Sequence, residues 1–212
     1  AYARHVLKGD GLRFGLVSTP FGPRVIDREA ALCIADAVVS GWVEDATVED
    51  DPVYAALARA LDGGGPSPAP GDAKRVRHRC DQVRRWRLQV ETLLRTLPAG
   101  GIERLPRGTI YLHTSHLRLD LPQRFGWLYA RRDVRPVFFV HDLIPITHPE
   151  YGRPGEAQRH AERMRTIGRH AAALVANSGD VAAQTERRLV RDGFPPRPVT
   201  VAHLGVEPCF GT

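Results

Sequence analysis

The stretch PVFFVHD, residues 136–142, decides the fold because it joins a continuous apolar run to a pair of polar residues. An apolar run without in-and-out alternation is typical of a strand covered on both faces, as in a parallel sheet flanked by helices. Similar runs are TIYLH (109–113), AALVA (172–176) and PVTVA (198–202), and LRFGLV (12–17) is a further candidate strand. The sequence therefore predicts several buried parallel strands.

Helical patterns alternate with these runs. We expect a helix capped by Asp27 and ended by Gly41, and others after Asp51-Pro52 and over about 74–97. Residues 156–170 place Ala157, Ala161, Met164 and Ile167 on one stripe, and a last helix begins at Ser178, presents Val181, Thr185 and Leu189 inward and ends at Asp192-Gly193. With right-handed crossovers, this alternation predicts an α/β fold with an open, doubly wound, mainly parallel Rossmann-like sheet.

The composition is that of an ordinary globular domain. The 212 residues are 42% hydrophobic and 25% charged, which suits one domain over 1–210 with a flexible loop at GGGPSPAPGD (63–72). No apolar run approaches the roughly 20 residues of a membrane span, and the first residues are too polar for a signal peptide. AYARHVL has helical spacing without a cap, so we expect the sequence to begin inside a helix.

Charge and cysteine usage narrow the partners and the compartment. The formal net charge of +6 favours anionic partners such as phosphates or an acidic lipid surface. The three cysteines, Cys33, Cys80 and Cys209, are far apart and form no Cys-x-x-Cys pair. A reducing compartment is therefore expected, which indicates a cytoplasmic protein, with contact at the inner face of the membrane left open.

Polar residues follow four of the predicted strands. His113, Ser115 and His116 follow the first, His141 and Asp142 the second, Asn177 and Ser178 the third, and His203 and Gly205 the fourth. Ligands of open α/β sheets bind at the carboxyl ends of parallel strands, and these ends meet at one rim. The sequence therefore predicts a site there, with His141-Asp142 as its centre.

Each of these residues also has a structural explanation. Asn177 or Ser178 suits the N-cap of a helix, and His113 and His116 suit hydrogen-bonded structural histidines. The basic run KRVRHRCDQVRRWR (74–87) is more typical of a solvated helix face than of a polyanion site, and Gly63-Gly64-Gly65 lacks the Walker lysine pattern. These features alone do not assign a ligand.

Four blocks in series carry a resemblance. VHDLIPITHPEY (140–151), RHAERM (159–164), VANSGD (175–180) and VAHLGVE (201–207) together resemble the second half of the N-terminal domain of family 4 glycosyltransferases, closest to mannosyltransferase-type bacterial members. The agreement covers roughly residues 109–210, about half of the chain, whereas residues 1–100 match weakly and lack the glycine-rich loop of the family. AYARHVL resembles the first helix after that loop, so the resemblance implies that the loop and the first strand of the sheet are missing upstream.

The resemblance implies a GT-B enzyme, whose N-terminal domain binds the acceptor and whose C-terminal domain binds the nucleotide-sugar. Residues 211–212 would begin the interdomain linker, the donor domain would be absent from this sequence, and the fragment alone would be inactive. The implied reaction is retaining transfer of a mannose-like hexose to a glycan or lipid-linked acceptor, without a metal or other cofactor and with no nucleic acid as partner. His141 would bind a sugar, and Asp142 would orient His141 or a sugar hydroxyl. His113, Ser115 and His116 would contact the acceptor. Asn177 and Ser178 would line the cleft, and His203 and Gly205 would shape the approach to the linker.

Two alternatives stay open. Strand-end histidines, with the spacing His113-x-x-His116, also suit a metal-dependent hydrolase, although a second acidic cluster is missing from the other strand ends. The basic charge also suits a non-enzymatic module that binds anionic ligands.

Overall fold

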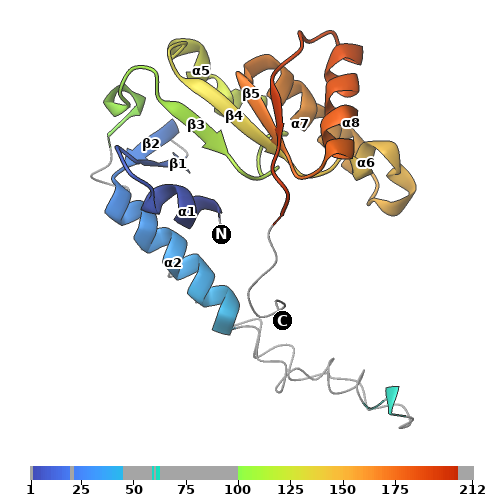
Figure 1. Cartoon of the computed structure of the whole chain (residues 1–212), viewed down its shortest axis with the longest axis horizontal. Helices are drawn as coiled ribbons and strands as arrows, with labels where there is room; N and C mark the ends of the chain where they lie inside the picture. Colours follow the sequence, from blue (N-terminus) through green and yellow to red (C-terminus); the bar gives the residue numbers. More distant parts are fainter. Residues whose placement is uncertain (1, 20–21, 45–58, 60, 63–99, 205–212) are drawn as a thin grey trace. The chain divides into compact units, whose positions relative to one another are not determined.

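Four of the predicted strands pair as one parallel sheet. In the computed structural model, which describes residues 2–19, 22–44, 59, 61–62 and 100–204, these strands are β3 (Ile110–His113), β4 (Arg135–Val140), β5 (Ala173–Ala176) and β6 (Val199–Val201). They lie in the order β3-β4-β5-β6, each parallel to its neighbour (Figure 1). The predicted α/β class with a parallel, Rossmann-like sheet is confirmed.

The connections between the strands hold the helices that cover the sheet. The β3–β4 connection holds η3 (Pro122–Phe125) and α5 (Trp127–Ala130). The β4–β5 connection holds α6 (Ile144–Thr147), η4 (Pro149–Tyr151) and α7 (Glu156–His170), and α8 (Gly179–Arg191) joins β5 to β6. Since strand order follows chain order, right-handed crossovers place these helices on one face of the sheet.

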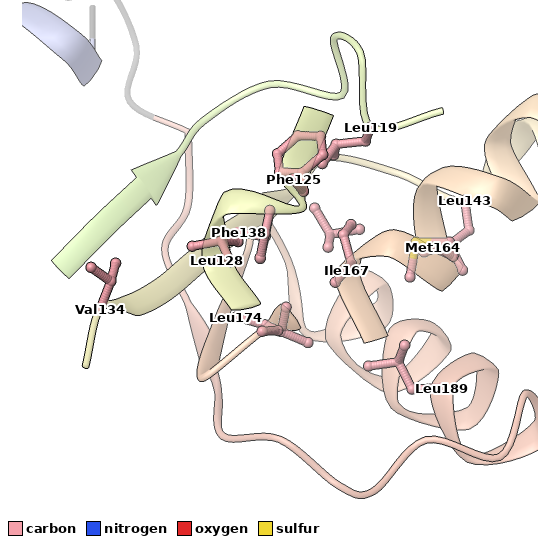
Figure 2. Packing of buried hydrophobic residues seen from close by; sticks show 12 residues of the cluster. Leu119, Phe125, Leu128, Val134, Phe138, Leu143, Met164, Ile167, Leu174 and Leu189 are labelled. Atoms are coloured by element: carbon pink, nitrogen blue, oxygen red, sulfur yellow. The ribbon is translucent and has the colours of Figure 1, made fainter. Parts of the chain in front are cut away.

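The core lies between that face and the helices. Phe138 of β4 and Leu174 of β5 are neighbours in the strand register, and they pack with Met164 and Ile167 of α7 (Figure 2). Further members of the cluster are Leu119, Phe125, Leu128, Val134, Val140, Leu143, Ala171 and Leu189. Met164, Ile167 and Leu189 occupy the inward positions that helical spacing predicted.

The ends of α8 follow the sequence signals. Ser178 is the N-cap, and its Oγ accepts a hydrogen bond from the N–H of Val181 at 3.2 Å. At the other end Gly193 adopts φ 80°, a left-handed conformation that glycine tolerates best. The N–H of Phe194 then reaches the carbonyl of Leu189 at 2.9 Å, which closes the helix in a Schellman motif.

This turn brings the ring of Phe194 against Gly168 of α7, where a Cβ would overlap the ring. We expect Gly168→Ala to lower the free energy of unfolding by up to about 2 kcal/mol, because overpacking costs about 1–3 kcal/mol and the helix propensity of alanine returns about 1 kcal/mol. Chemical denaturation measures the change. Gly179→Ala is the control, since no atom lies within 4 Å of a Cβ there. Equal effects of the two substitutions, or persistence of the Gly168→Ala effect in a Phe194→Ala background, would contradict this packing.

A single arginine anchors the segment before β3. The guanidinium of Arg131 donates to the backbone carbonyls of Ile102, Leu105 and Pro106, and pairs with Asp133 at 2.8 Å. The short helix η2 (Ile102–Arg104) is part of this segment. The hydrogen bond from Arg131 holds the pKa of the Asp133 carboxyl well below its usual range. Arg131 therefore ties residues 102–106 to the end of α5.

The chain divides into two compact units, residues 1–17 with 24–100 and residues 18–23 with 101–212. In the first, α1 (Tyr2–Lys8) and α2 (Arg28–Glu44) share a small cluster of Leu7, Ile26 and Ala31. The sheet described above lies in the second. The domain bounds expected from the sequence stay a prediction.

Two expectations about the first 44 residues were confirmed in part, with different bounds. The strand expected over 12–17 is β1 (Gly15–Thr19), and it pairs with the unpredicted β2 (Gly22–Ile26) as a separate two-stranded sheet. Asp27 does cap α2, accepting the N–H of Ala30 at 2.8 Å, but the helix continues through Gly41 to Glu44. An interior glycine costs a helix only about 1 kcal/mol, so it does not by itself end one.

The loop expected at 63–72 and the helices expected after Asp51-Pro52 and over 74–97 lie outside the described residues.

Candidate functional site

Two histidines from adjacent strand ends meet at the carboxyl edge of the sheet. His116 lies in the loop after β3, and His141 directly follows β4. The backbone N–H of His141 donates to Nε2 of His116 at 3.3 Å, and the ring centroids are 5.4 Å apart. The sequence prediction that these residues share one rim is therefore met by direct contact.

The ring of His141 is held in one orientation. Its Nε2 lies 2.8 Å from the carbonyl oxygen of Thr114, and the ring stacks on Phe139 with centroids 4.4 Å apart and planes 27° apart. A carbonyl only accepts, so Nε2 carries the proton and donates. In the neutral ring Nδ1 then keeps a lone pair that can accept a hydrogen bond from a ligand.

A third histidine, which the sequence analysis did not select, completes the group. His160 of α7 is 1% exposed, its Nε2 lies 3.1 Å from the backbone carbonyl oxygen of Asp142, and its ring centroid lies 4.9 Å from that of His116. A signal for it existed, since His160 lies four residues before Met164, which places it on the same side of the helix as the predicted stripe. A histidine at an inward position needs polar partners, and here the rim supplies them.

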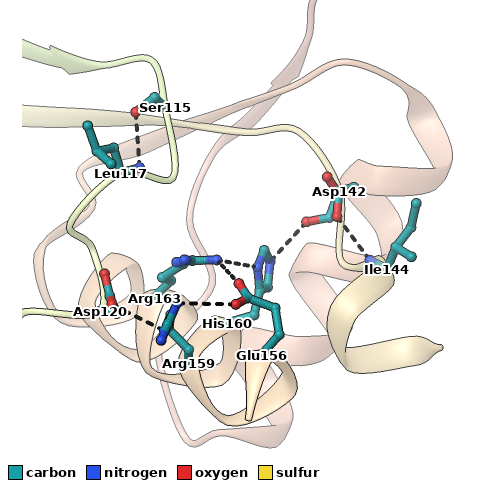
Figure 3. A network of polar contacts seen from close by, with 9 residues as sticks. All are labelled: Ser115, Leu117, Asp120, Asp142, Ile144, Glu156, Arg159, His160 and Arg163. Atoms are coloured by element: carbon teal, nitrogen blue, oxygen red, sulfur yellow. Dashed lines mark hydrogen bonds and ion pairs between the residues drawn. The ribbon is translucent and has the colours of Figure 1, made fainter. Parts of the chain in front are cut away.

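An ion pair supports His160 from the far side. Nη1 of Arg163 lies 3.3 Å from Nδ1 of His160 and 2.7 Å from a carboxylate oxygen of Glu156 (Figure 3). All three residues belong to α7. Glu156 also pairs with Arg159, which lies 3.7 Å from Asp120. The histidine group is thus joined to a network of fixed charges.

The surroundings keep the imidazoles of His116 and His160 neutral. Burial, followed by the positive fields of His160, His141 and Arg163, lowers the pKa of His116 to about 4, and Asp142 offsets this only in part. Burial also lowers the pKa of His160, against the opposing effects of Asp142 and Glu156. At neutral pH both rings can therefore accept as well as donate hydrogen bonds.

Asp142 and Ser115 shape the loops around the histidines. The carboxylate of Asp142 accepts the N–H of Ile144 at 3.1 Å, at the start of α6. The hydroxyl of Ser115 accepts the N–H of Leu117 at 3.0 Å. Both bonds are local turns of the kind that Asp and Ser favour. The expected role of Asp142 in orienting a sugar or His141 stays a prediction.

His113 lies apart from the other histidines of the rim. It is the register partner of Phe138 and packs against that ring and Phe125 on the helix-covered face. Its Nδ1 lies 2.8 Å from the hydroxyl of Tyr111, and burial lowers its pKa. Its Nε2 is buried and has no hydrogen-bond partner among the described residues. This setting matches the structural explanation more closely than an acceptor contact.

The remaining predicted residues follow β5 and β6. Asn177 directly follows β5, and its buried Oδ1 has no partner in the described part of the chain, whereas Ser178 is the cap of α8. His203 is exposed after β6, and Gly205 lies outside the described residues. Their expected contacts with substrate stay predictions.

Comparison of this chain with protein families, with curated proteins and with solved structures finds no match in any of the three. Within the described ranges, no group of three or more His, Cys, Asp or Glu side chains is arranged to hold a metal ion. Among the same residues, no helix has the length and apolar character of a membrane span.

Proposed function

We propose that this chain is the acceptor-side domain of a retaining, metal-independent glycosyltransferase of the GT-B type. In this proposal it works with a donor-binding domain in cis and transfers a mannose-like hexose from a nucleotide-sugar to a glycan or lipid-linked acceptor. The first support is the resemblance of four sequence blocks to family 4 glycosyltransferases. The second is that two of those blocks, 140–151 and 159–164, supply His141 and His160 to one group of histidines at the carboxyl edge of a parallel sheet.

The observation that carries the proposal is the fixed orientation of the His141 imidazole. With its Nε2 proton donated to Thr114, the ring offers the Nδ1 lone pair to a hydroxyl group. A sugar hydroxyl is a ligand of this chemistry. Because Phe139 and Thr114 already hold the ring, little reorganisation is needed when the sugar binds, which is the condition for electrostatic stabilisation of a transition state.

A glycosyltransferase site must stabilise the charges that separate in the transition state. As the bond to the nucleotide diphosphate breaks, positive charge grows at the anomeric carbon and negative charge on the leaving group. A neutral histidine can position the reacting sugar without adding repulsion to that cationic carbon. The proposal therefore gives His141 a binding and orienting role in the transition state.

We expect His141→Ala to lower nucleotide release by about 100-fold, the effect of removing one preorganised polar group from a transition state. The assay measures release from a panel of UDP- and GDP-sugars in EDTA, using the protein together with the donor-binding domain that the proposal requires. The control is His5→Ala, since His5 is an exposed histidine of α1.

The outcomes separate the proposal from its alternatives. Release from one donor that survives in His141→Ala would keep the reaction and contradict the role of His141. No release from any donor, together with phosphoester hydrolysis after zinc or manganese is added, would replace the proposal by a metal-dependent hydrolase. Binding of anions that depends on salt and is indifferent to His141 would indicate a non-enzymatic module.

A further inference from the structure

The turn after β4 is held at two consecutive residues by two other histidines. His116 accepts the N–H of His141 at 3.3 Å, and His160 lies 3.1 Å from the carbonyl oxygen of Asp142. One contact comes from the β3 loop and the other from α7. The backbone of residues 141–142 is therefore fixed from both sides.

The partners of His160 define its tautomer. The Asp142 carbonyl can only accept, so Nε2 of His160 must donate and carry the proton. Its Nδ1 then holds a lone pair. This nitrogen faces Nη1 of Arg163, which can only donate a hydrogen bond. Glu156 holds that guanidinium at 2.7 Å. Glu156, Arg163 and His160 thus form a chain in which every proton position is set.

The partners of His116 require the opposite arrangement. The N–H of His141 donates to Nε2, so that atom holds a lone pair and the proton of the neutral ring lies on Nδ1. His116 also packs edge-on against His160, with an angle of 81° between the ring planes. Two adjacent imidazoles of opposite tautomer therefore grip one turn, one as donor and the other as acceptor.

We propose that His160, fixed by Arg163 and Glu156, is a positioning residue that, together with His116, holds the His141-Asp142 turn in place. The clamp is a property of this chain, and its bearing on catalysis rests on the function proposed above. The competing explanation is that His160 only fills the core, in which case an apolar side chain of similar size serves as well.

The first test uses the wild-type chain and the ¹⁵N chemical shifts of its histidine rings at neutral pH. We expect His160 with its proton on Nε2 and His116 with its proton on Nδ1. The reverse tautomer of either ring would overturn the proposal, and no variant has to fold for this result to count.

The second test compares His160→Leu with His160→Gln, whose amide can still donate to the Asp142 carbonyl. The His141 amide keeps its bond to His116 in the leucine variant, but the turn that contains it loses the hydrogen bond at the Asp142 carbonyl. Because the turn then opens with one ordinary hydrogen bond less to break, we expect the His141 amide to exchange about tenfold faster. The glutamine variant should restore wild-type exchange. His170→Leu is the matched control, because it makes the same change on the same helix beside Tyr129, away from the turn. Exchange that is equal in the leucine and glutamine variants would overturn the clamp.

Nucleotide release then distinguishes failure of the clamp from failure of the function. If sugar transfer occurs, His160→Leu should move His141 out of place and slow nucleotide release by about tenfold to 100-fold. His160→Gln should recover the wild-type rate of release. Faster exchange without release from any donor would support the clamp and contradict the proposed reaction. Release that is unchanged in the leucine variant, with unchanged exchange, would sink the clamp and leave the reaction standing.

Discussion

Replacing Phe138 by alanine will lower the free energy of unfolding by about 3–5 kcal/mol. Phe138 is fully buried at the centre of the parallel sheet, where its ring contacts those of Tyr111, His113 and Phe125. Its register neighbour on β5 is Leu174, which is also buried. The substitution leaves a cavity that strands on both sides prevent from closing, so both the transfer energy and the packing are lost. Equilibrium unfolding in denaturant measures the effect.

The matched control for Phe138→Ala is Tyr129→Ala. Tyr129 is an aromatic residue of α5 with 58% of its surface exposed, so its removal should change the free energy of unfolding by about 0.5 kcal/mol or less. Similar effects of the two substitutions, or a Phe138→Ala effect below about 1 kcal/mol, would show that the face of the sheet around β4 is not the centre of the core.

Acidification from pH 7 to pH 4 will destabilise the folded chain, and His116 will contribute about 2–3 kcal/mol of the loss. The folded pKa of His116 is about 4, below its ordinary value near 6.5, because the ring is buried beside His160, His141 and Arg163. Between pH 4 and pH 6.5, this histidine therefore binds a proton more readily in the unfolded chain than in the folded chain. The stability is therefore complete above about pH 6.5 and falls as the pH approaches 4.

The difference between two variants isolates this contribution. In His116→Gln the side-chain carbonyl can still accept the N–H of His141 but does not titrate, so stability should fall less steeply with acid. The control is the substitution His148→Gln. His148 is exposed and pairs with Glu150 at 3.2 Å. A His116→Gln chain that loses as much stability as the wild type between pH 6.5 and 4 would contradict the neutral state of His116. Burial lowers the pKa of His160, His113 and His170 in the same direction, so some acid sensitivity should remain.

The sheet was predictable because its signals are local. PVFFV and AALVA are short continuous apolar runs, which favour buried strands of a parallel sheet, and they became β4 and β5 with a shift of one residue at the start. Ser178 and Gly193 bounded α8 because capping and left-handed turns depend on one or two residues. By contrast, β2 begins with Gly22-Pro23, which is typical of a turn, and only its pairing with β1 makes it a strand.

The candidate site was predictable only in part, for a geometric reason. His116 and His141 follow neighbouring parallel strands, so their meeting follows from sheet topology alone. His160 belongs to a helix, and its approach to the rim depends on how α7 packs, which no local pattern specifies. The setting of His113 depends on which way the last residue of β3 faces, and the register with Phe138 turns it toward the core.

The consecutive strand order also bears on how the sheet assembles during synthesis. Each of β4, β5 and β6 pairs with the strand that left the ribosome just before it, and the helix between them has already been made. Among the described strands β3–β6, none has to wait for a distant partner or be inserted between two strands already paired. Because closing short loops costs less entropy than closing long ones, we expect the β3–β6 region to grow strand by strand as the chain emerges, with β6 as the last addition.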